Sequence, residues 1–291
     1  MPADRDKRSS RTGEGSTPRI ITSLQNDTVK LIRSLDMRKA RRETGLFVAE
    51  GASVLITARD NGWRPRMLVT GPDAATATAT PDLVRWAAKA NADHLEVSAA
   101  VLEKLAAKEN PQSVMAVFEQ RWLEPPHADH LTANADSQKL PPLWIALEDI
   151  RDPGNLGTIL RTADAAGASG VLLVGNTCDP FSREAVRASM GSVFAIPVAR
   201  TDLDGLRKIA DSWTGAIIGT HLEGATDYRK ADWRPPTLLI MGNEGAGLST
   251  TATAMCTSLV RIPMAGKLDS LNLAVATALM LYEIRRNDLP A

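Results

Sequence analysis

The chain has 291 residues, of which 34 are Lys or Arg and 34 are Asp or Glu, so its formal net charge is 0; hydrophobic residues make up 44%. This length can bury one or two cores, and the apolar fraction is too high for a disordered chain. Two cysteines, Cys178 and Cys256, exclude a disulfide scaffold and favour a reducing cytoplasm. No apolar run reaches the roughly 18 residues that span a bilayer, and the zero charge balance argues at first against a nucleic-acid partner.

The first 120 residues divide into a polar tail and a predicted small domain. Residues 1–18 are low in large apolar side chains, so we expect a disordered tail, and no apolar segment typical of a secretory signal follows it. From residue 19 to 120 the hydrophobic pattern alternates between helical and extended spacing, which is typical of an α/β domain. The pattern predicts helices over 28–35, 52–61, 82–90 and 99–107, strands over 46–49, 66–70, near 95 and over 114–118, and a Thr/Ala-rich loop over 71–81.

A proline-containing stretch separates this domain from a second α/β unit. Residues 121–142 carry proline pairs at both ends of a polar segment, which indicates a linker. Residues 143–291 then show strand-like runs at 143–147, 171–174, 193–198, 216–219, 238–241 and 259–262. These runs are continuously apolar and therefore favour a parallel sheet covered on both faces. The main helices are expected at about 155–167, ending on a left-handed Gly167, and at about 271–286.

The first of three motifs that carry chemistry follows the strand at 143–147. It reads EDIRDPGNLGTILRTA over residues 148–163 and lies at a strand-to-helix junction, the edge of a parallel sheet where ligands bind. The stretch 152–154 predicts a turn, and Asn155 is placed to cap the helix. Arg161 follows six residues later, and spacing alone does not distinguish a site residue from an ordinary surface arginine.

The second motif, MGNEGAGLS over residues 241–249, directly follows a strand. Gly242, Gly245 and Gly247 place three glycines in six positions, which indicates left-handed dihedrals or close approach of the backbone to a ligand. The spacing is not that of a dinucleotide-binding fingerprint. It is not a P-loop either, because Gly266-Lys267 is followed by Leu268. Alone, the motif is equally compatible with a plain tight turn.

The third motif, IPMAGKLDSLNLAVA, covers residues 262–276. A strand is expected to end at Ile262, and Ser270 is placed to cap the final helix. Asn272 then lies in the first turn of that helix, where a buried amide would need hydrogen-bond partners. A capping role explains this residue as well as a catalytic one does.

Together and in this order, the three motifs resemble those of the SpoU (TrmH) family of RNA ribose 2′-O-methyltransferases, part of the SPOUT superfamily. The resemblance spans residues 143–288 and is carried by Asn155-Leu156-Gly157 with Arg161, Gly242-Asn243-Glu244-Gly245 with Gly247-Leu248, and Ile262-Pro263-Met264 with Ser270-Leu271-Asn272. In the N-terminal part, Ser23-Leu24-Gln25-Asn26, Arg41 and Phe47-Val48-Ala49-Glu50-Gly51 are similar to that family's substrate-binding domain, which resembles an RNA-binding ribosomal protein. The resemblance implies an α/β sheet whose C-terminal segment, roughly 237–288, is threaded into a deep trefoil knot.

The resemblance also implies a reaction, the transfer of a methyl group from S-adenosylmethionine to a ribose 2′-hydroxyl, without a metal. Carried over to this chain, Gly242, Ile262 and Leu271 contact the cofactor, and Thr220 is a further candidate for lining its pocket. Arg161 is the residue assigned to the 2′-hydroxyl. Because an arginine has a pKa above about 12, two roles stay open. It acts as a base whose proton a substrate phosphate draws off, or it stays charged and stabilises the developing alkoxide.

Other residues receive supporting or ordinary roles. Asn272 is expected to orient Arg161 by hydrogen bonding, while Asn155 and Glu244 support the loop geometry and the RNA contact. The remaining candidates, expected to be packing or surface residues, are His127, His130, His221, Cys178 and Cys256. Members of the family act as homodimers, commonly through the C-terminal helix, and the apolar run 271–282 is compatible both with that interface and with core burial.

Two other functional classes fit parts of the pattern. A non-catalytic RNA-binding paralogue would keep the fold, but the joint presence of Arg161, Glu244 and Asn272 favours an enzyme. A nucleotide-dependent oxidoreductase is disfavoured by the missing G-x-G-x-x-G fingerprint. Among RNA substrates, the N-terminal domain favours large-subunit ribosomal RNA over transfer RNA, by analogy of fold.

The zero net charge hides an uneven distribution along the chain. Residues 1–42 hold 11 basic and 5 acidic residues, 11 − 5 = +6, so the rest of the chain carries −6. Phosphate contacts need a local basic surface rather than a basic total. We therefore expect Arg38, Lys39, Arg41 and Arg42 to contact RNA.

Overall fold

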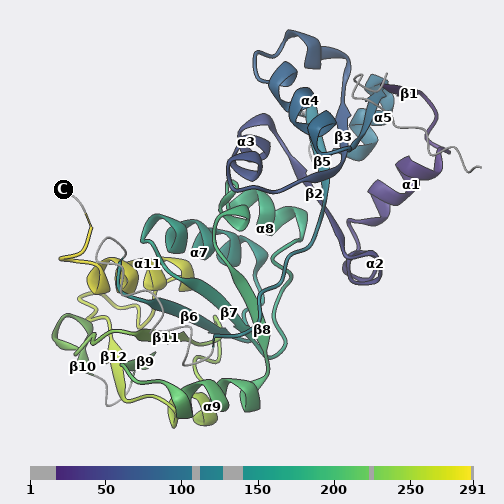
Figure 1. Cartoon of the computed structure of the whole chain (residues 1–291). Helices are drawn as coiled ribbons and strands as arrows, with labels where there is room; N and C mark the ends of the chain where they lie inside the picture. The colour runs from purple at the N-terminus through teal and green to yellow at the C-terminus, as the bar shows by residue number, and fades with distance from the viewer. Residues whose placement is uncertain (1–17, 107–111, 127–139, 223–225, 290–291) are drawn as a thin grey trace, which may run out of the picture.

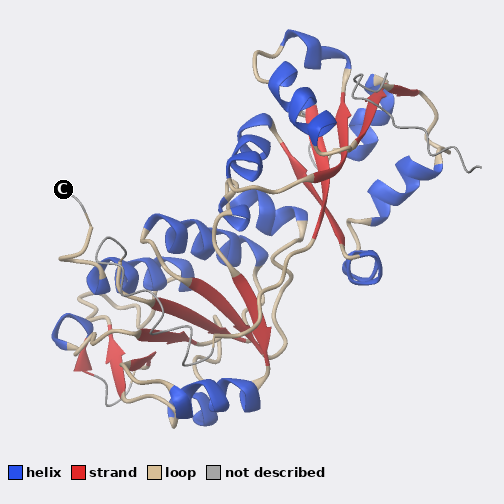
Figure 2. Ribbon diagram, in the orientation of Figure 1, coloured by secondary structure: helices blue, strands red, loops and turns tan. Residues whose placement is uncertain are grey.

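The computed structural model describes residues 18–106, 112–126, 140–222 and 226–289. They form two sheets, each covered by helices (Figures 1 and 2). The α/β class predicted from the sequence is confirmed. The predicted disordered tail, apart from Pro18, and both His127 and His130 lie outside the described residues.

The N-terminal sheet has five strands in the order β1-β4-β3-β5-β2. The first three of these run parallel to one another, and β5 pairs antiparallel with both β3 and β2. Helices α3 and α4 cover one face and α1 and α5 the other (Figure 1). The elements are β1 (Arg19–Ile21), α1 (Asp27–Ser34), α2 (Arg38–Thr44), β2 (Leu46–Glu50), α3 (Ala52–Asp60), β3 (Pro65–Thr70), the 3₁₀ turn η1 (Pro72–Thr76), α4 (Thr80–Lys89), β4 (Asp93–Val97), α5 (Ala99–Leu105) and β5 (Val114–Glu119).

The C-terminal sheet has seven strands, all parallel, in the order β10-β12-β9-β11-β6-β7-β8. The predicted parallel sheet is thus confirmed. Helices α7, α8 and α11 pack on one face, while α9 and α10 pack on the other. The elements are β6 (Leu143–Glu148), α7 (Pro153–Ala165), β7 (Gly170–Val174), α8 (Arg183–Ala188), η2 (Ser192–Phe194), β8 (Val198–Thr201), α9 (Leu203–Ser212), β9 (Ile217–Thr220), β10 (Thr226–Asp227), η3 (Tyr228–Lys230), β11 (Thr237–Met241), α10 (Thr250–Thr253), β12 (Ser258–Arg261) and α11 (Leu273–Ile284).

Two predicted helix starts are wrong, and both errors concern the capping residue. Helix α7 begins at Pro153, and its cap is Asp152, whose carboxylate accepts a hydrogen bond from the Asn155 backbone N–H at 2.6 Å. Helix α11 is capped by Asn272 rather than Ser270, because Asn272 Oδ1 accepts from the next two free backbone N–H groups of the helix. Both asparagine side chains therefore stand at the start of a helix, at the carboxyl edge of the sheet.

One predicted strand and part of one predicted loop are also wrong. The apolar run 193–198 is mostly the 3₁₀ turn η2 and the segment after it, and the strand β8 starts only at Val198. Phe194 in this run packs on aromatic side chains of the N-terminal sheet instead of joining a strand. The stretch 71–81 contains η1 and the first residues of α4.

An aromatic cluster joins the two sheets into one continuous core. Phe47 from β2 lies 4.7 Å from Phe181 and 5.7 Å from Phe194, measured between ring centroids. Trp63 contacts Phe194 edge to face at 5.0 Å and donates its indole N–H to the Phe194 carbonyl at 2.8 Å. The largest buried cluster accordingly contains residues from both sheets, so their relative placement is fixed by packing. No helix among the described residues is long and apolar enough to cross a membrane.

Candidate functional site

The second and third motifs line one cavity of about 740 Å³ at the carboxyl-terminal ends of β9, β11 and β12. All four residues predicted to bind the cofactor belong to its lining: Thr220 ends β9, Gly242 follows β11, Ile262 follows β12, and Leu271 precedes α11. They come together because parallel strands end at the same edge of the sheet. The apolar part of the wall is formed by Met241, Leu248, Val260, Leu273, Ala276 and Met280. The volume and the lining, an apolar wall with several polar groups, are those of a small-molecule pocket.

Gly242 is required by the close packing of the second-motif loop. A Cβ placed on it would collide with the backbone of Gly247 and Leu248. Gly247 needs its lack of a side chain for a different reason, because it has a φ of +69°. The loop folds back on itself through paired backbone hydrogen bonds between Asn243 and Gly247, both at 3.0 Å. The three glycines thus form a tight backbone turn that is also a wall of the cavity.

Glu244 connects this loop to the first motif. Its carboxylate accepts hydrogen bonds from the backbone N–H of Arg151 at 3.2 Å and of Asp152 at 3.1 Å, and from the Asn155 side-chain amide at 3.4 Å. The backbone turn before α7 therefore converges on a single carboxylate. This contact brings the first and second motifs together, as the sequence predicts for a shared site.

Asn155 and Asn272 link the first motif to the third. The Asn272 side-chain N–H donates to Asn155 Oδ1 at 2.9 Å, and Asn272 Oδ1 caps α11. The expectation that Asn272 orients Arg161 by a direct hydrogen bond is not met, because both ends of its amide are engaged elsewhere. A chain of hydrogen bonds instead runs from Glu244 through Asn155 to Asn272.

Arg161 lies on the solvent side of α7. Its side chain is exposed, it makes no hydrogen bond or ion pair with the described residues, and it does not line the cavity. An arginine left unpaired at the surface of α7, the helix whose first turn carries Asn155, is available to bind an anionic or hydroxylic ligand.

Sequence reasoning missed Asn243 as an organiser of the site. Its amide N–H donates to the Asp149 carbonyl at 2.9 Å, and its Oδ1 accepts from the backbone N–H groups of Gly245 and Ala246 at 2.9 and 3.0 Å. An asparagine two residues before a glycine is the pattern of an Asx turn and would have indicated this role. Asp149 has a φ of +51°, so the turn that it shares with Asn243 is strained.

The charge on Glu244 holds the turn before α7. Burial alone would raise the pKa of this carboxyl, but hydrogen bonds from three backbone N–H groups and the Asn155 amide outweigh burial and hold the pKa below the ordinary value of 4.5. Because the folded-state pKa is lowered, the stabilisation is fully present above pH 4.5 and is lost as the pH falls through the lower folded value.

Glu244→Gln should therefore loosen the turn at neutral pH. We expect backbone amide hydrogen exchange at Arg151 and Asp152 to become about 10-fold faster, since each loses a bond to a charged acceptor. In the unmodified protein the protection factors of these two amides should decrease only below pH 4.5, and in the variant they should not depend on pH in that range. Equal protection in the two proteins at pH 7 would contradict this role of Glu244.

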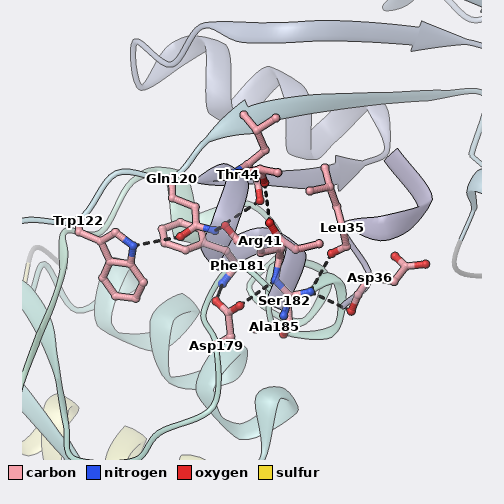
Figure 3. A network of polar contacts seen from close by, with 12 residues as sticks. Leu35, Asp36, Arg41, Thr44, Gln120, Trp122, Asp179, Phe181, Ser182 and Ala185 are labelled. Atoms are coloured by element: carbon pink, nitrogen blue, oxygen red, sulfur yellow. Dashed lines mark hydrogen bonds and ion pairs between the residues drawn. The ribbon is translucent and has the colours of Figure 1, made fainter. Parts of the chain in front are cut away.

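The basic cluster of α2 is only partly available to a ligand. Arg38, Lys39 and Arg42 are exposed, whereas Arg41 is buried and its expected RNA contact is wrong. Figure 3 shows why: the Arg41 guanidinium donates to Asp179 at 2.7 Å and to the carbonyls of Leu35 and Asp36 at 2.8 and 2.9 Å. Arg41 thus joins the N-terminal unit to the loop after β7.

The two cysteines offer no reactive thiol at neutral pH. Burial raises the pKa of the Cys178 thiol to about 12, and the nearby carboxylates of Glu244 and Asp152 add to the effect. Burial likewise raises the pKa of Cys256 to about 12. Both thiols therefore stay protonated and unreactive at neutral pH. His221 lines the cavity, and the described residues contain no cluster of metal-binding side chains.

Two protein families match this chain over complementary ranges. The SpoU rRNA methylase family matches residues 142–282, and the MRM3-like substrate binding domain matches residues 26–116. Among curated relatives, the 23S rRNA (uridine(2479)-2′-O)-methyltransferase of Streptomyces viridochromogenes is 32% identical over 87% of this chain and 86% of its own length. The 23S rRNA (guanosine(2553)-2′-O)-methyltransferase of Bacillus subtilis is 30% identical over 91% of this chain and 98% of its own.

Solved structures are similar over nearly the whole chain. An AdoMet-bound rRNA methyltransferase from Sinorhizobium meliloti superposes with a TM-score of 0.83 at 44% identity, covering 94% of this chain and 99% of that one. The SpoU methyltransferase AviRb from Streptomyces viridochromogenes, in complex with AdoMet, gives a TM-score of 0.76 at 30% identity, covering 90% and 98%. Both of these structures contain bound S-adenosylmethionine (AdoMet).

Proposed function

This chain belongs to the SpoU rRNA methylase family, and we propose that it transfers a methyl group from S-adenosylmethionine to a ribose 2′-hydroxyl of large-subunit ribosomal RNA. The observation that carries the proposal is the cavity of about 740 Å³ between the second and third motifs, next to the Glu244–Asn155–Asn272 chain. The reaction class, the cofactor and the ribosomal substrate agree with the relatives of similar length.

The residues of the cavity fit the cofactor. Its apolar wall suits an adenine ring, and the close packing of Gly242 against Gly247 and Leu248 fixes the loop that lines the cavity. The carboxylates of Glu244 and Asp269 in the lining complement a positively charged sulfonium. We assign Gly242, Ile262 and Leu271 to cofactor contacts, with Thr220 at the rim.

In this reaction the protein side chains orient the ribose and stabilise the developing charge. Bound S-adenosylmethionine supplies an already activated methyl group, so the protein has to hold the ribose and assist loss of the hydroxyl proton. We assign that task to Arg161, which is exposed and unpaired among the described residues. Asn155 and Asn272 fix the starts of α7 and α11 relative to each other, and Glu244 holds the loop that faces the cavity.

A transfer assay tests this proposal. The purified chain, labelled S-adenosylmethionine and either large-subunit ribosomal RNA or transfer RNA should give label in a 2′-O-methylnucleoside of the ribosomal RNA alone. RNA from a strain lacking the protein should correspondingly have lost one ribose methylation in the large subunit. Loss of a transfer RNA site with all ribosomal sites retained would overturn the substrate, and RNA binding without transfer would identify a non-catalytic paralogue.

We propose further that the chain is divided as 19–120 for RNA binding, 121–142 as a linker and 143–291 for transfer. The ranges of the two matching families support this division. We propose a trefoil knot in 237–288, supported by the segment 262–271 running beside the loop 242–247 along one cavity before α11 packs on the α7 face. An experimental chain trace that passes outside that loop would overturn the knot. The ribosomal substrate supports a cytoplasmic location, which cell fractionation tests.

We also propose a homodimer through α11. This helix is almost entirely apolar, yet Val275, Leu279 and Tyr282 leave 50%, 38% and 49% of their surface exposed along one stripe. An apolar stripe of this kind on a family member with a C-terminal interface is best covered by a second copy. Light scattering should give twice the chain mass of 31.2 kDa, and a monomer mass would contradict the dimer.

A further inference from the structure

A second, basic cavity lies where the two sheets meet. Its volume is about 910 Å³, and it opens between helix α2 and the loops that follow β7 and β8. Arg38, Lys39 and Arg42 line it from α2, and Arg200 and Trp122 line it from the C-terminal side. We call this the junction groove. It is distinct from the cavity lined by the second and third motifs.

The positive charge of the junction groove is not neutralised within the molecule. Arg38, Arg42 and Arg200 form no ion pair with the described residues, and Lys39 reaches only Glu43, at 3.9 Å. Of the two lining carboxylates, Asp179 is bound by Arg41 and Asp202 caps α9. Unpaired, exposed arginines on both walls of one groove are free to form charge-assisted hydrogen bonds with an anionic ligand.

Arg200 is held in a fixed orientation by Trp122. Its guanidinium lies over the indole ring, 4.8 Å from the centroid. The indole is fixed in turn by the edge-to-face contact with Phe181 at 5.1 Å and by its N–H, which donates to the Gln120 side chain at 3.1 Å (Figure 3). A guanidinium plane supported in this way can bind a phosphate at its edge and stack on a base with its outer face.

The floor of the groove is connected to the candidate active site. It is formed by residues 175–180, and in this loop the Asn176 backbone N–H donates to the Asp149 carboxylate at 2.7 Å. The carbonyl of Asp149 accepts from Asn243, which organises the cofactor loop. A ligand lying in the groove would therefore contact a loop that is hydrogen-bonded to the turn holding the first and second motifs together.

We propose that the junction groove binds a single-stranded segment of the RNA substrate, with Arg38, Arg42 and Arg200 on successive phosphates and Arg200 stacked on one base. This inference rests on the proposed function for the identity of the ligand. It places the RNA between the two sheets rather than on the N-terminal unit alone, and it adds Arg200 and its positioning residue Trp122 to the RNA-binding set.

The test is the salt dependence of RNA binding by the full-length chain. The triple variant Arg38→Gln, Arg42→Gln, Arg200→Gln should bind labelled oligouridine and large-subunit ribosomal RNA about 10-fold or more weakly. The slope of log Kd against log salt should fall by about 2, because each single-strand phosphate contact contributes about 0.7. Arg64→Gln, an exposed arginine outside the groove, is the matched control and should leave both values unchanged.

Trp122 is tested through its dependence on Arg200. Trp122→Leu should weaken RNA binding as much as Arg200→Gln does, the two together should add nothing further, and Trp122→Phe should retain most of the affinity. A merely structural role for Trp122 would give additive losses instead and would overturn its assignment as a positioning residue.

Binding is measured with S-adenosylhomocysteine present, so it does not depend on methyl transfer. Unchanged affinity and salt slope in the triple variant would overturn the groove even if the protein methylates ribosomal RNA. If the triple variant shows a reduced salt slope but the unmodified protein methylates no RNA, RNA binding in the groove is supported and the proposed function is overturned.

Discussion

Replacing Arg161 by alanine should lower the rate constant for methyl transfer about 100-fold or more, while the affinity for S-adenosylmethionine changes little. Removing a group that assists proton loss or stabilises a developing oxyanion costs 10²- to 10⁴-fold in enzymes generally. Arg161 does not line the cavity assigned to the cofactor, so cofactor binding should not depend on it. Its exposed side chain makes no contact that folding would lose, so the unfolding free energy should stay within about 0.5 kcal/mol.

Single-turnover methylation of ribosomal RNA and calorimetric titration of S-adenosylmethionine measure the two quantities. The control is Arg207→Ala. Arg207 is also an exposed arginine, but it lies on α9, and its variant should keep the full rate. A rate in Arg161→Ala within a few-fold of the unmodified protein would remove this residue from the catalytic machinery.

The variant Arg161→Lys separates the two roles that sequence reasoning left open. A lysine ionises near pH 10.4, where an arginine stays charged. If the charge itself stabilises the alkoxide, the variant should retain part of the rate at neutral pH and lose it as the pH rises past about 10. If the side chain acts as the base, the rate of this variant should rise through the same pH range instead.

The parts of the site that the sequence predicts are those set by strand ends. Thr220, Gly242, Ile262 and Leu271 lie far apart in the chain, yet each follows a strand or precedes a helix at one edge of a parallel sheet. The apolar runs and the turns after them predict that edge of the sheet, while the assignment of these residues to the cofactor comes from the family resemblance. Glu244 is expected only to support the loop geometry and the RNA contact, and the structure adds that its carboxylate accepts from the Asp152 backbone N–H.

The parts that could not be predicted depend on partners distant in sequence. Ser270 and Asn272 are both good caps, and only the bond from Asn272 to Asn155, 117 positions away, distinguishes them. The run 193–198 has the pattern of a strand because it is apolar, but Phe194 is buried against Trp63 and Phe118 of the N-terminal unit. Periodicity reports that a residue is buried and not which surface buries it.

Arg41 is the most consequential residue whose role the sequence could not predict. Its neighbours in sequence indicate an exposed RNA contact, whereas its neighbours in space make it a buried ion-pair partner. Arg38, Lys39 and Arg42 are exposed, while the Arg41 side chain is 5% exposed and pairs with Asp179, whose side chain is 12% exposed. We expect Arg41→Met to lower the unfolding free energy by about 3 kcal/mol. The substitution leaves a buried carboxylate without its partner, and the carbonyls of Leu35 and Asp36 lose their donor.

Urea unfolding monitored by circular dichroism measures this loss, with an exposed ion pair as the control. Arg66 and Glu119 lie 3.3 Å apart with 64% and 65% of their side chains exposed, so Arg66→Met should cost less than about 1 kcal/mol. The double variant Arg41→Met, Asp179→Asn should recover part of the loss, since the unpaired charge is then gone. Equal losses in Arg41→Met and Arg66→Met would show that the buried pair contributes no more than a surface one.

The same substitution should separate RNA methylation from cofactor binding. Arg41 lies on α2, which forms one wall of the junction groove. It is bonded to Asp179, which belongs to the loop that forms the floor. Breaking this bond lets the two sides of the groove move apart, whereas the cavity between the second and third motifs contains no atom of either residue. In Arg41→Met we therefore expect KM for ribosomal RNA to rise about 10-fold or more, with the Kd for S-adenosylmethionine unchanged. An unchanged KM in a folded variant would mean that the groove keeps its shape without the pair, and that the aromatic core around Phe47 and Phe194 alone fixes the two sheets.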